Sequence, residues 1–165
     1  MSVDRIGDTQ LIIDECVRYG CTRDQCAYIL ATAFWETART MKPVQEAFWL
    51  SENWRKKNLR YYPWHGRGYV QITWKRNYVF AANKLNIPFD KDPSLALVSE
   101  HAVKILVAGS MEGWFTKKKL PDYISQSKCD FVNARRVING KDKAVTIAAI
   151  AHSYNEALKL EGYPQ

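Results

Sequence analysis

Glu36 is the residue of this sequence best suited to acid–base chemistry. It falls on the same predicted helical stripe as the apolar residues Ile29 and Ala33. Because burial disfavours the charged form of a carboxyl group, a glutamic acid in apolar surroundings can keep its proton and act as a general acid. The alternative is a structural role, in which Glu36 forms a buried ion pair with Arg39 or Arg67.

Glu46 offers a second carboxylate, beyond the turn that Pro43 imposes on the chain. Glycoside hydrolysis uses two carboxyl groups on opposite sides of a sugar. One protonates the leaving oxygen, and the other activates a water molecule or attacks the anomeric carbon. Glu36 and Glu46 could face each other over a cleft in this way. Glu52 competes for the second role, and the spacing alone does not choose between Glu46 and Glu52.

The segment Tyr61–Tyr78 supplies the side chains that a sugar site needs. Its Tyr and Trp rings can stack on the apolar faces of pyranoses, and the neutral side chains of Gln71, Thr73 and Asn77 suit hydroxyl and N-acetyl groups. The residues between Tyr62 and Ile72 favour a short β-hairpin, which would put Gln71 and Thr73 on one side of a strand. The alternative for most of these aromatic residues is core packing.

Positive charge gathers around this segment. Between Asn53 and Phe89 there are eight Lys or Arg residues and no Asp or Glu, so this stretch carries +8 in a chain of net charge +7. The remainder of the chain is therefore at −1. A basic surface with aromatic rings favours an anionic polymer as partner, and single-stranded nucleic acid is one alternative.

The remaining patterns predict a protein that is all-α or nearly so. Thr22 and Gln25 have the form of a capping box ahead of the helix that carries Glu36, and Gly20 is expected to end the helix before it. Ser99 is expected to cap a later helix. Helices are predicted over about residues 9–19, 23–37, 74–85, 99–112, 121–137 and 144–159. In the fifth of these, a break near Ser127 is one alternative, and Asn139-Gly140 is expected to end it.

Length and composition predict one domain spanning residues 1–165. No apolar run reaches the length of a membrane span, and the first residues lack the apolar core of a secretory signal, so synthesis and folding in a cytoplasm are expected. The four cysteines match neither a zinc motif nor a disulfide framework and are predicted to be buried thiols. No metal or nucleotide motif is present, so no cofactor is expected.

The segment Tyr62–Tyr78 resembles the signature of glycoside hydrolase family 19, the chitinase-like lysozyme fold, in its single-domain phage endolysin form. The family pattern is Y-x-G-R-G-x-x-Q-[IL]-[ST]-x-x-x-N-Y, and the chain has Trp64-His65-Gly66-Arg67-Gly68-Tyr69-Val70-Gln71-Ile72-Thr73-Trp74-Lys75-Arg76-Asn77-Tyr78. The stretch 31–38 is similar to the family helix that ends in His-Glu-[ST], whose Glu is the general acid. Trp35 replaces that His, and Ala38-Arg39 replaces a common Gly-Gly.

The resemblance implies roles for particular residues. It makes Glu36 the general acid and favours Glu46 as the general base, although Trp49-Leu50-Ser51-Glu52 resembles the corresponding stretch of plant members and keeps Glu52 as the alternative. Substrate-binding or water-positioning roles are implied for Gln71, Thr73, Asn77, Arg67, Tyr69, Arg136 and Asn139. The last two belong to Arg136-Val137-Ile138-Asn139-Gly140, which is similar to the Arg-x-[IV]-Asn-Gly element of the family.

The implied fold is a mainly α, lysozyme-like helical domain with a catalytic cleft and at most a small β-hairpin. The implied function is that of a monomeric peptidoglycan-degrading endolysin, which cleaves β-1,4 bonds of the glycan strand with inversion, for lysis of the host cell. Such an enzyme would be stored in the host cytoplasm and reach the cell wall through a separate membrane-pore protein, with no stable membrane insertion and no nucleic-acid partner. The alternatives are a chitinase acting on chitin oligomers and a binding module, for glycan or single-stranded nucleic acid, without catalysis.

Overall fold

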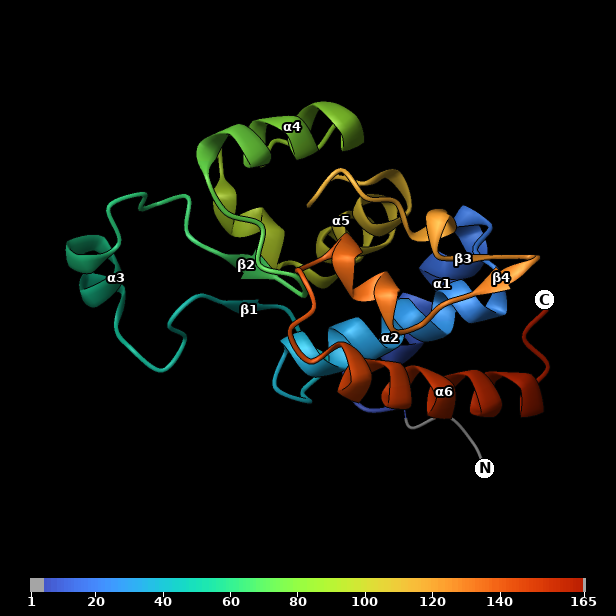
Figure 1. Ribbon diagram of the computed structural model, residues 1–165. Coiled ribbons are helices and arrows are strands. Elements are labelled where there is room, and N and C mark those ends of the chain that lie inside the picture. Colours follow the sequence, from blue (N-terminus) through green and yellow to red (C-terminus); the bar gives the residue numbers. More distant parts are fainter. Residues whose placement is uncertain (1–4, 165) are drawn as a thin grey trace.

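The computed structural model describes residues 5–164, and in this part of the chain helices predominate (Figure 1). The helices are α1 (Thr9–Tyr19), α2 (Arg23–Glu36), α3 (Glu52–Asn58), α4 (Lys75–Leu85), α5 (Ser99–Glu112) and α6 (Ala144–Leu160). Three short 3-10 helices are η1 (Pro93–Leu97), η2 (Leu120–Asp122) and η3 (Asn133–Val137). Two-residue strands occur at β1 (Val44–Gln45), β2 (Arg67–Gly68), β3 (Ile124–Ser125) and β4 (Lys128–Cys129). The mainly helical class is as predicted, and none of the helices within residues 5–164 has the length and apolar character needed to cross a membrane.

Helix α2 is the centre of the larger hydrophobic core. The predicted capping box is present: the Gln25 amide donates to Thr22 Oγ1 at 3.2 Å, and the Thr22 amide donates to Gln25 Oε1 at 2.8 Å. Every residue from Gln25 to Ala33 is buried, so neighbours cover this helix on all sides and not along one stripe only. Helix α6 packs along it, and α1 and α5 also contact it. This packing holds the last residue of α2, Glu36, at a fixed place at the edge of the core.

A second, smaller hydrophobic cluster joins α4 to α5. Its buried members include Tyr78 and Ala81 from α4 and Ile105 from α5. The loop 69–73 connects the two clusters, because Tyr69 packs in the larger core and Ile72 in the smaller one. Residues between these two anchors therefore lie at the boundary between the clusters.

The predicted hairpin within residues 62–72 is wrong in its pairing. Strand β2 pairs with β1 in antiparallel register, Val44 with Gly68 and Gln45 with Arg67. Inside the predicted hairpin there is only an isolated bridge between Arg67 and Ile72. The chain turns tightly between those two residues, and Gln71 takes a left-handed conformation with φ of 58°. Such a turn leaves no length for a second strand.

The predicted helix over 121–137 is also wrong. This stretch forms η2, an antiparallel hairpin of β3 and β4, and η3. The Ser127 amide donates to Ser125 Oγ at 3.4 Å in the hairpin turn, and the Asn133 amide donates to Asp130 Oδ1 at 3.0 Å just before η3. Short polar side chains that bond to nearby backbone compete with helix formation, which explains the difference.

Two smaller expectations also need correction. Ser99 is the first residue of α5 and not its cap, since Val98 occupies that position and Ser99 Oγ donates to Asp8 Oδ2 at 2.7 Å. Three of the four cysteines are buried thiols as predicted, but Cys129 in β4 is exposed. Helix α1 ends as predicted, with Gly20 in the left-handed conformation.

Candidate active site

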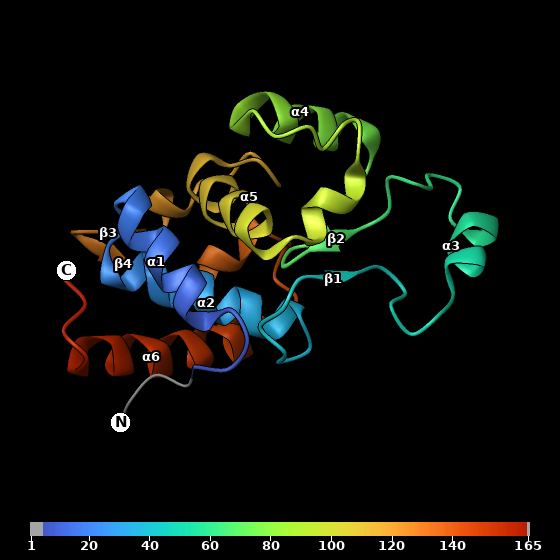
Figure 2. The ribbon, with the colours of Figure 1, turned by 180° about the vertical axis from the view of Figure 1, so that it is seen from behind.

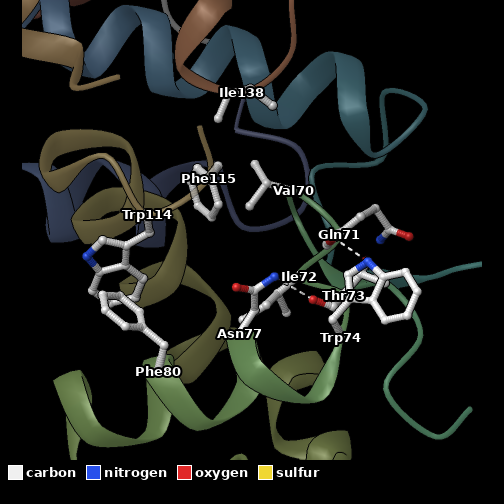
Figure 3. A pocket seen from close by; sticks show the side chains of 10 residues that line it. All are labelled: Val70, Gln71, Ile72, Thr73, Trp74, Asn77, Phe80, Trp114, Phe115 and Ile138. Atoms are coloured by element: carbon white, nitrogen blue, oxygen red, sulfur yellow. Dashed lines mark hydrogen bonds between the residues drawn. The ribbon is translucent and has the colours of Figure 1, made fainter. Parts of the chain in front are cut away.

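A groove of about 190 Å³ lies at the boundary of the two hydrophobic clusters (Figure 3). Three segments far apart in the sequence line it: the loop 70–74 with the start of α4, the residues that follow α5, and the residue that follows η3. The lining residues are Val70, Gln71, Ile72, Thr73, Trp74, Asn77, Phe80, Trp114, Phe115 and Ile138. Three of the residues predicted for substrate contact, Gln71, Thr73 and Asn77, are among them.

Backbone contacts hold this polar wall in place. Gln71 Nε2 donates to the carbonyl of Val44 at 2.7 Å, Thr73 Oγ1 donates to the carbonyl of Gln71 at 2.9 Å, and Asn77 Nδ2 donates to the carbonyl of Thr73 at 2.7 Å. The three side chains are brought together by a turn and the first turn of α4, and not by the shared strand that the sequence pattern predicts. Each amide has a carbonyl oxygen that can still accept a hydrogen bond from a ligand.

An aromatic wall completes the groove. The rings of Phe80 and Trp114 meet edge to face, with centroids 5.4 Å apart, and Phe80 is 45% exposed. Phe115 packs so tightly on α5 that a Cβ added at Gly109 would lie 2.3 Å from its ring. Phe80, Trp114 and Phe115 were not among the predicted site residues, and the available signal was the Trp-Phe pair directly after Gly113, the glycine that ends α5. Apolar rings beside neutral polar groups give the groove the character of a sugar site.

Glu36 forms an ion pair with Arg135, which reaches it from η3. Arg135 Nη2 lies 2.7 Å from Glu36 Oε1, and the Arg135 side chain is 2% exposed whereas that of Glu36 is 24% exposed. Arg135 Nε also donates to the carbonyl of Asp142 at 2.8 Å. Glu36 thus forms an ion pair, as the structural alternative predicted, but the predicted partners Arg39 and Arg67 are wrong, because the partner is Arg135.

Sequence reasoning selected Arg136 and missed its neighbour Arg135. The side chain of Arg136 is half-buried, and its backbone carbonyl accepts a hydrogen bond from Thr116 Oγ1 at 2.7 Å. The 3-10 geometry of η3 turns Arg135 inward, toward Glu36, and leaves Arg136 nearer the surface. The motif resemblance assigned a role to Arg136 alone, whereas the neighbouring Arg135 is the arginine that faces the core.

Glu46 follows β1 and is held against the loop between Tyr61 and Gly66. Its Oε1 accepts the Gly66 amide at 2.9 Å, and its Oε2 accepts the hydroxyl of Tyr61. Burial and this carboxylate raise the pKa of Tyr61 to about 12, so the tyrosine stays a donor to Glu46 at ordinary pH. A Cβ at Gly66 would lie 2.7 Å from Gln71 Oε1, which shows that Gln71 packs directly on the residue that binds Glu46. The half-buried Glu46 is therefore adjacent to the polar wall.

Glu52, the alternative second carboxylate, lies elsewhere. It starts α3, its side chain is 55% exposed, and it binds Arg55 and the hydroxyl of Tyr62, the latter at 2.5 Å. The hydrogen bond from Tyr62, aided by Arg55, holds the pKa of Glu52 below its ordinary value. No contact links Glu52 to a groove residue within the described part of the chain. The geometry favours Glu46 over Glu52 as the partner of Glu36.

The other predicted site residues do not line the groove. Arg67 is buried and donates to the carbonyl of Pro63 at 2.7 Å, and Tyr69 is buried and donates to Asp8 at 2.6 Å. Both support the loops behind the groove. Asn139 is exposed, and its side chain accepts the amide of Gly140 at 2.9 Å. Ile138, between the two predicted residues of that element, is the one that lines the groove.

His65 is enclosed in the same loop and acts as a neutral group. It is fully buried, its Nε2 lies 3.1 Å from Gln45 Oε1, and Tyr62 stacks on its ring. Burial, with the charge of Arg67 as the next cause, lowers the pKa of His65 to about 4. Within residues 5–164, no group of three or more His, Cys, Asp or Glu side chains is arranged to hold a metal ion.

The two carboxylates are thus anchored to segments that form the groove. Glu36 is held by Arg135, three residues before the lining residue Ile138, and Glu46 is held by Gly66, on which the lining residue Gln71 packs. No model of a known protein family matches the sequence, and a search of curated proteins finds no match.

Proposed function

We propose that this protein is a glycoside hydrolase of the chitinase-like lysozyme type, related to glycoside hydrolase family 19, that cleaves the glycan strand of peptidoglycan. The observation that carries the proposal is the groove, in which neutral amides and a hydroxyl lie beside aromatic rings. Two carboxylates, Glu36 and Glu46, are anchored to segments that lead into it. In this proposal the protein is a phage endolysin that lyses the host cell, and a separate pore protein releases it to the cell wall.

Substrate binding follows from the two walls of the groove. A sugar ring can stack on the exposed ring of Phe80 beside Trp114, while its hydroxyl and N-acetyl groups bond to Gln71 and Asn77. The groove itself has no charged lining residue, which suits uncharged sugar rings. The +8 charge between Asn53 and Phe89 favours encounter with an anionic glycan such as peptidoglycan over neutral chitin.

Catalysis in this proposal divides between the two glutamates. Glu36 protonates the glycosidic oxygen, and Glu46 removes a proton from the attacking water, which Thr73 helps to position. Arg135 holds the carboxyl group of Glu36 in place for this step. A sugar lying over Glu36 would exclude water from the reacting groups.

The substrate is tested directly with purified protein. We expect release of soluble fragments from purified peptidoglycan at a higher rate than cleavage of chitin oligomers, and mass spectrometry of the products identifies the new reducing-end sugar. Faster cleavage of chitin oligomers would make the protein a chitinase. Absence of cleavage, together with tight and salt-sensitive binding of single-stranded DNA, would replace the hydrolase with a nucleic-acid binder.

A further inference from the structure

Residues 47–64 form a lobe that projects from the body of the molecule in both ribbon views, with α3 at its tip (Figures 1 and 2). Three large apolar side chains of this lobe are exposed: Phe48 at 58%, Trp49 at 71% and Trp54 at 38%. The rings of Phe48 and Trp49 contact each other edge to face, with centroids 5.3 Å apart. None of the three lines the groove, so substrate binding there does not explain their exposure.

The lobe is a hydrogen-bonded frame. Arg55 is only 4% exposed, and its Nη1 donates to the carbonyls of Ala47 at 2.7 Å and Leu50 at 2.9 Å. Ser51 Oγ accepts the amide of Trp54 at 3.1 Å and caps α3. One buried guanidinium thus ties the loop that carries Phe48 and Trp49 to the helix that carries Trp54. The aromatic side chains are held in solvent by this frame.

The free charges of the lobe are all positive. Lys56, Lys57 and Arg60 are exposed, and none of them forms an ion pair within residues 5–164. The two carboxylates at the lobe are engaged, since Glu46 binds Tyr61 and Glu52 binds Arg55 and Tyr62. The tip therefore presents aromatic rings and unpaired cations together.

We propose that this lobe docks on the surface of an anionic phospholipid bilayer. Trp and Phe side chains settle at the boundary between headgroups and acyl chains, and each nearby Lys or Arg adds attraction to anionic headgroups. A polymer partner, whether glycan or nucleic acid, would be gripped by rings that line a groove. The exposed rings belong to a lobe that projects from the body of the molecule, which fits a flat, penetrable surface better. The proposal does not depend on the catalytic assignment.

Vesicle binding by the full-length protein tests the aromatic part of the proposal. We expect sedimentation with phosphatidylglycerol-containing vesicles and little with pure phosphatidylcholine. The double variant Phe48→Ser, Trp49→Ser should bind the anionic vesicles at least about tenfold more weakly, because it removes two apolar side chains from the lipid interface. The matched control is Val145→Ser, Leu160→Ser on α6, which removes two side chains that are 73% and 67% exposed and should change binding little. Equal binding by the double variant and the wild type would overturn the proposal.

Charge reversal tests the electrostatic part. Lys56→Glu, Lys57→Glu should weaken binding at least about tenfold, since each cation near an anionic surface contributes about 1 kcal/mol. The control is Lys117→Glu, Lys118→Glu, which alters two exposed lysines outside the lobe. If both pairs weaken binding equally, the attraction belongs to the whole charge of the protein and the lobe is not the docking site.

Insertion of the lobe into the bilayer is measured by the quenching of tryptophan fluorescence. Brominated acyl chains should quench part of the tryptophan fluorescence, and Trp49→Phe should remove most of that quenching while keeping the fold and the binding. Quenching that is unchanged in Trp49→Phe would contradict the proposal. Loss of single-stranded DNA binding in the lobe variants, with vesicle binding intact, would assign the lobe to nucleic acid.

Discussion

At the scale of single residues, Arg135 controls what Glu36 can do. Its guanidinium holds Glu36 with one nitrogen and the carbonyl of Asp142 with another, so it fixes the carboxyl group at the end of α2 and joins it to the segment after η3. A Lys at this position keeps the charge but has no planar fork to make both contacts. Arg135 is therefore a positioning residue for the proposed acid.

Arg135→Lys should lower the free energy of unfolding by about 1–3 kcal/mol, because buried polar groups lose their partner. Urea unfolding measures this change, and peptidoglycan hydrolysis should fall with it as Glu36 loses its fixed orientation. Arg136→Lys is the matched control and should stay within about 0.5 kcal/mol of the wild type, since that side chain is only half-buried. Equal effects of the two variants would contradict the role assigned to Arg135.

The identity of the second carboxylate gives another prediction at this scale. Glu46→Gln keeps an oxygen that can accept the Gly66 amide but cannot take a proton from water, so turnover of peptidoglycan should fall by about 10²–10⁴-fold with little change in stability. Glu52→Gln should remain close to wild-type activity, because Glu52 binds Arg55 and Tyr62 and does not line the groove. The reverse order of the two effects would transfer the role to Glu52.

The sequence predicted the position of the polar wall of the groove better than the ion-pair partner of Glu36. Gln71, Thr73 and Asn77 lie within seven residues of one motif, so their proximity needs only local structure. Arg135, the partner of Glu36, is about a hundred residues away along the chain. Arg135 and not Arg136 reaches Glu36 because the 3-10 helix η3 turns the side chain of Arg135 toward the core. Contacts of that kind follow from tertiary packing and cannot be read from spacing.

At the scale of elements, the groove depends on how α5 ends. Gly113 ends the helix in the left-handed conformation, and the chain turns back so that Trp114 and Phe115 line the groove. The ring of Phe115 packs where a side chain on Gly109 would lie. The absence of a side chain at Gly109 therefore shapes one wall of the groove.

Gly109→Ala tests this packing. The added Cβ would come within 2.3 Å of Phe115, and overpacking of this kind costs about 1–3 kcal/mol, against about 1 kcal/mol gained from the better helix propensity of Ala. We expect a net loss of about 1 kcal/mol in thermal or urea unfolding and weaker substrate binding, as the ring shifts into the groove. Gly140→Ala, which meets no atom within 4 Å, is the control and should be neutral. A neutral Gly109→Ala would show that Phe115 moves freely.

Local signals decided which elements the sequence predicts correctly. The Thr22 capping box and the glycine after α1 act within a few residues, and both are confirmed. The pairing of β1 with β2 joins residues more than twenty positions apart, so the pattern around Tyr69 predicted a strand with the wrong partner. The hairpin of β3 and β4 replaced a predicted helix because Ser125 and Asp130 bond to nearby backbone amides. These hydrogen bonds leave the spacing of the apolar residues unchanged, so the apolar pattern alone still predicted a helix.

At the scale of the whole molecule, Asp8 ties distant segments together. It precedes α1 and is buried, and its carboxylate accepts hydrogen bonds from Tyr69 at 2.6 Å, Ser99 at 2.7 Å and Lys42 at 2.9 Å. Burial acts to raise the pKa of Asp8, but the three donors together outweigh it and hold the pKa below its ordinary value of 3.8. The Asp8 carboxylate therefore joins three parts of the chain: the loop behind the groove through Tyr69, the start of α5 through Ser99, and the segment after α2 through Lys42.

Asp8 should make stability depend on pH in the acid range. Because its pKa is lower in the folded protein, its contribution is fully present above about pH 4 and is lost as pH falls further, when the folded carboxylate takes up a proton. Asp8→Asn should cost about 1–3 kcal/mol at pH 7, and the difference from wild type should shrink below about pH 4. Urea unfolding across pH measures this, with the exposed Asp14→Asn as control. A difference that stays constant with pH would contradict the assignment.

The proposed role of Glu36 as the general acid is tested most directly by one substitution. Glu36→Gln keeps the shape of the side chain but cannot donate the proton, so hydrolysis of purified peptidoglycan should fall by about 10²–10⁴-fold while the protein stays folded and still binds the glycan. Glu100→Gln, an exposed glutamate on α5, is the control and should hydrolyse at the wild-type rate. Hydrolysis by Glu36→Gln at a rate close to that of the wild type would show that Glu36 is not the acid and that the proposed mechanism is wrong.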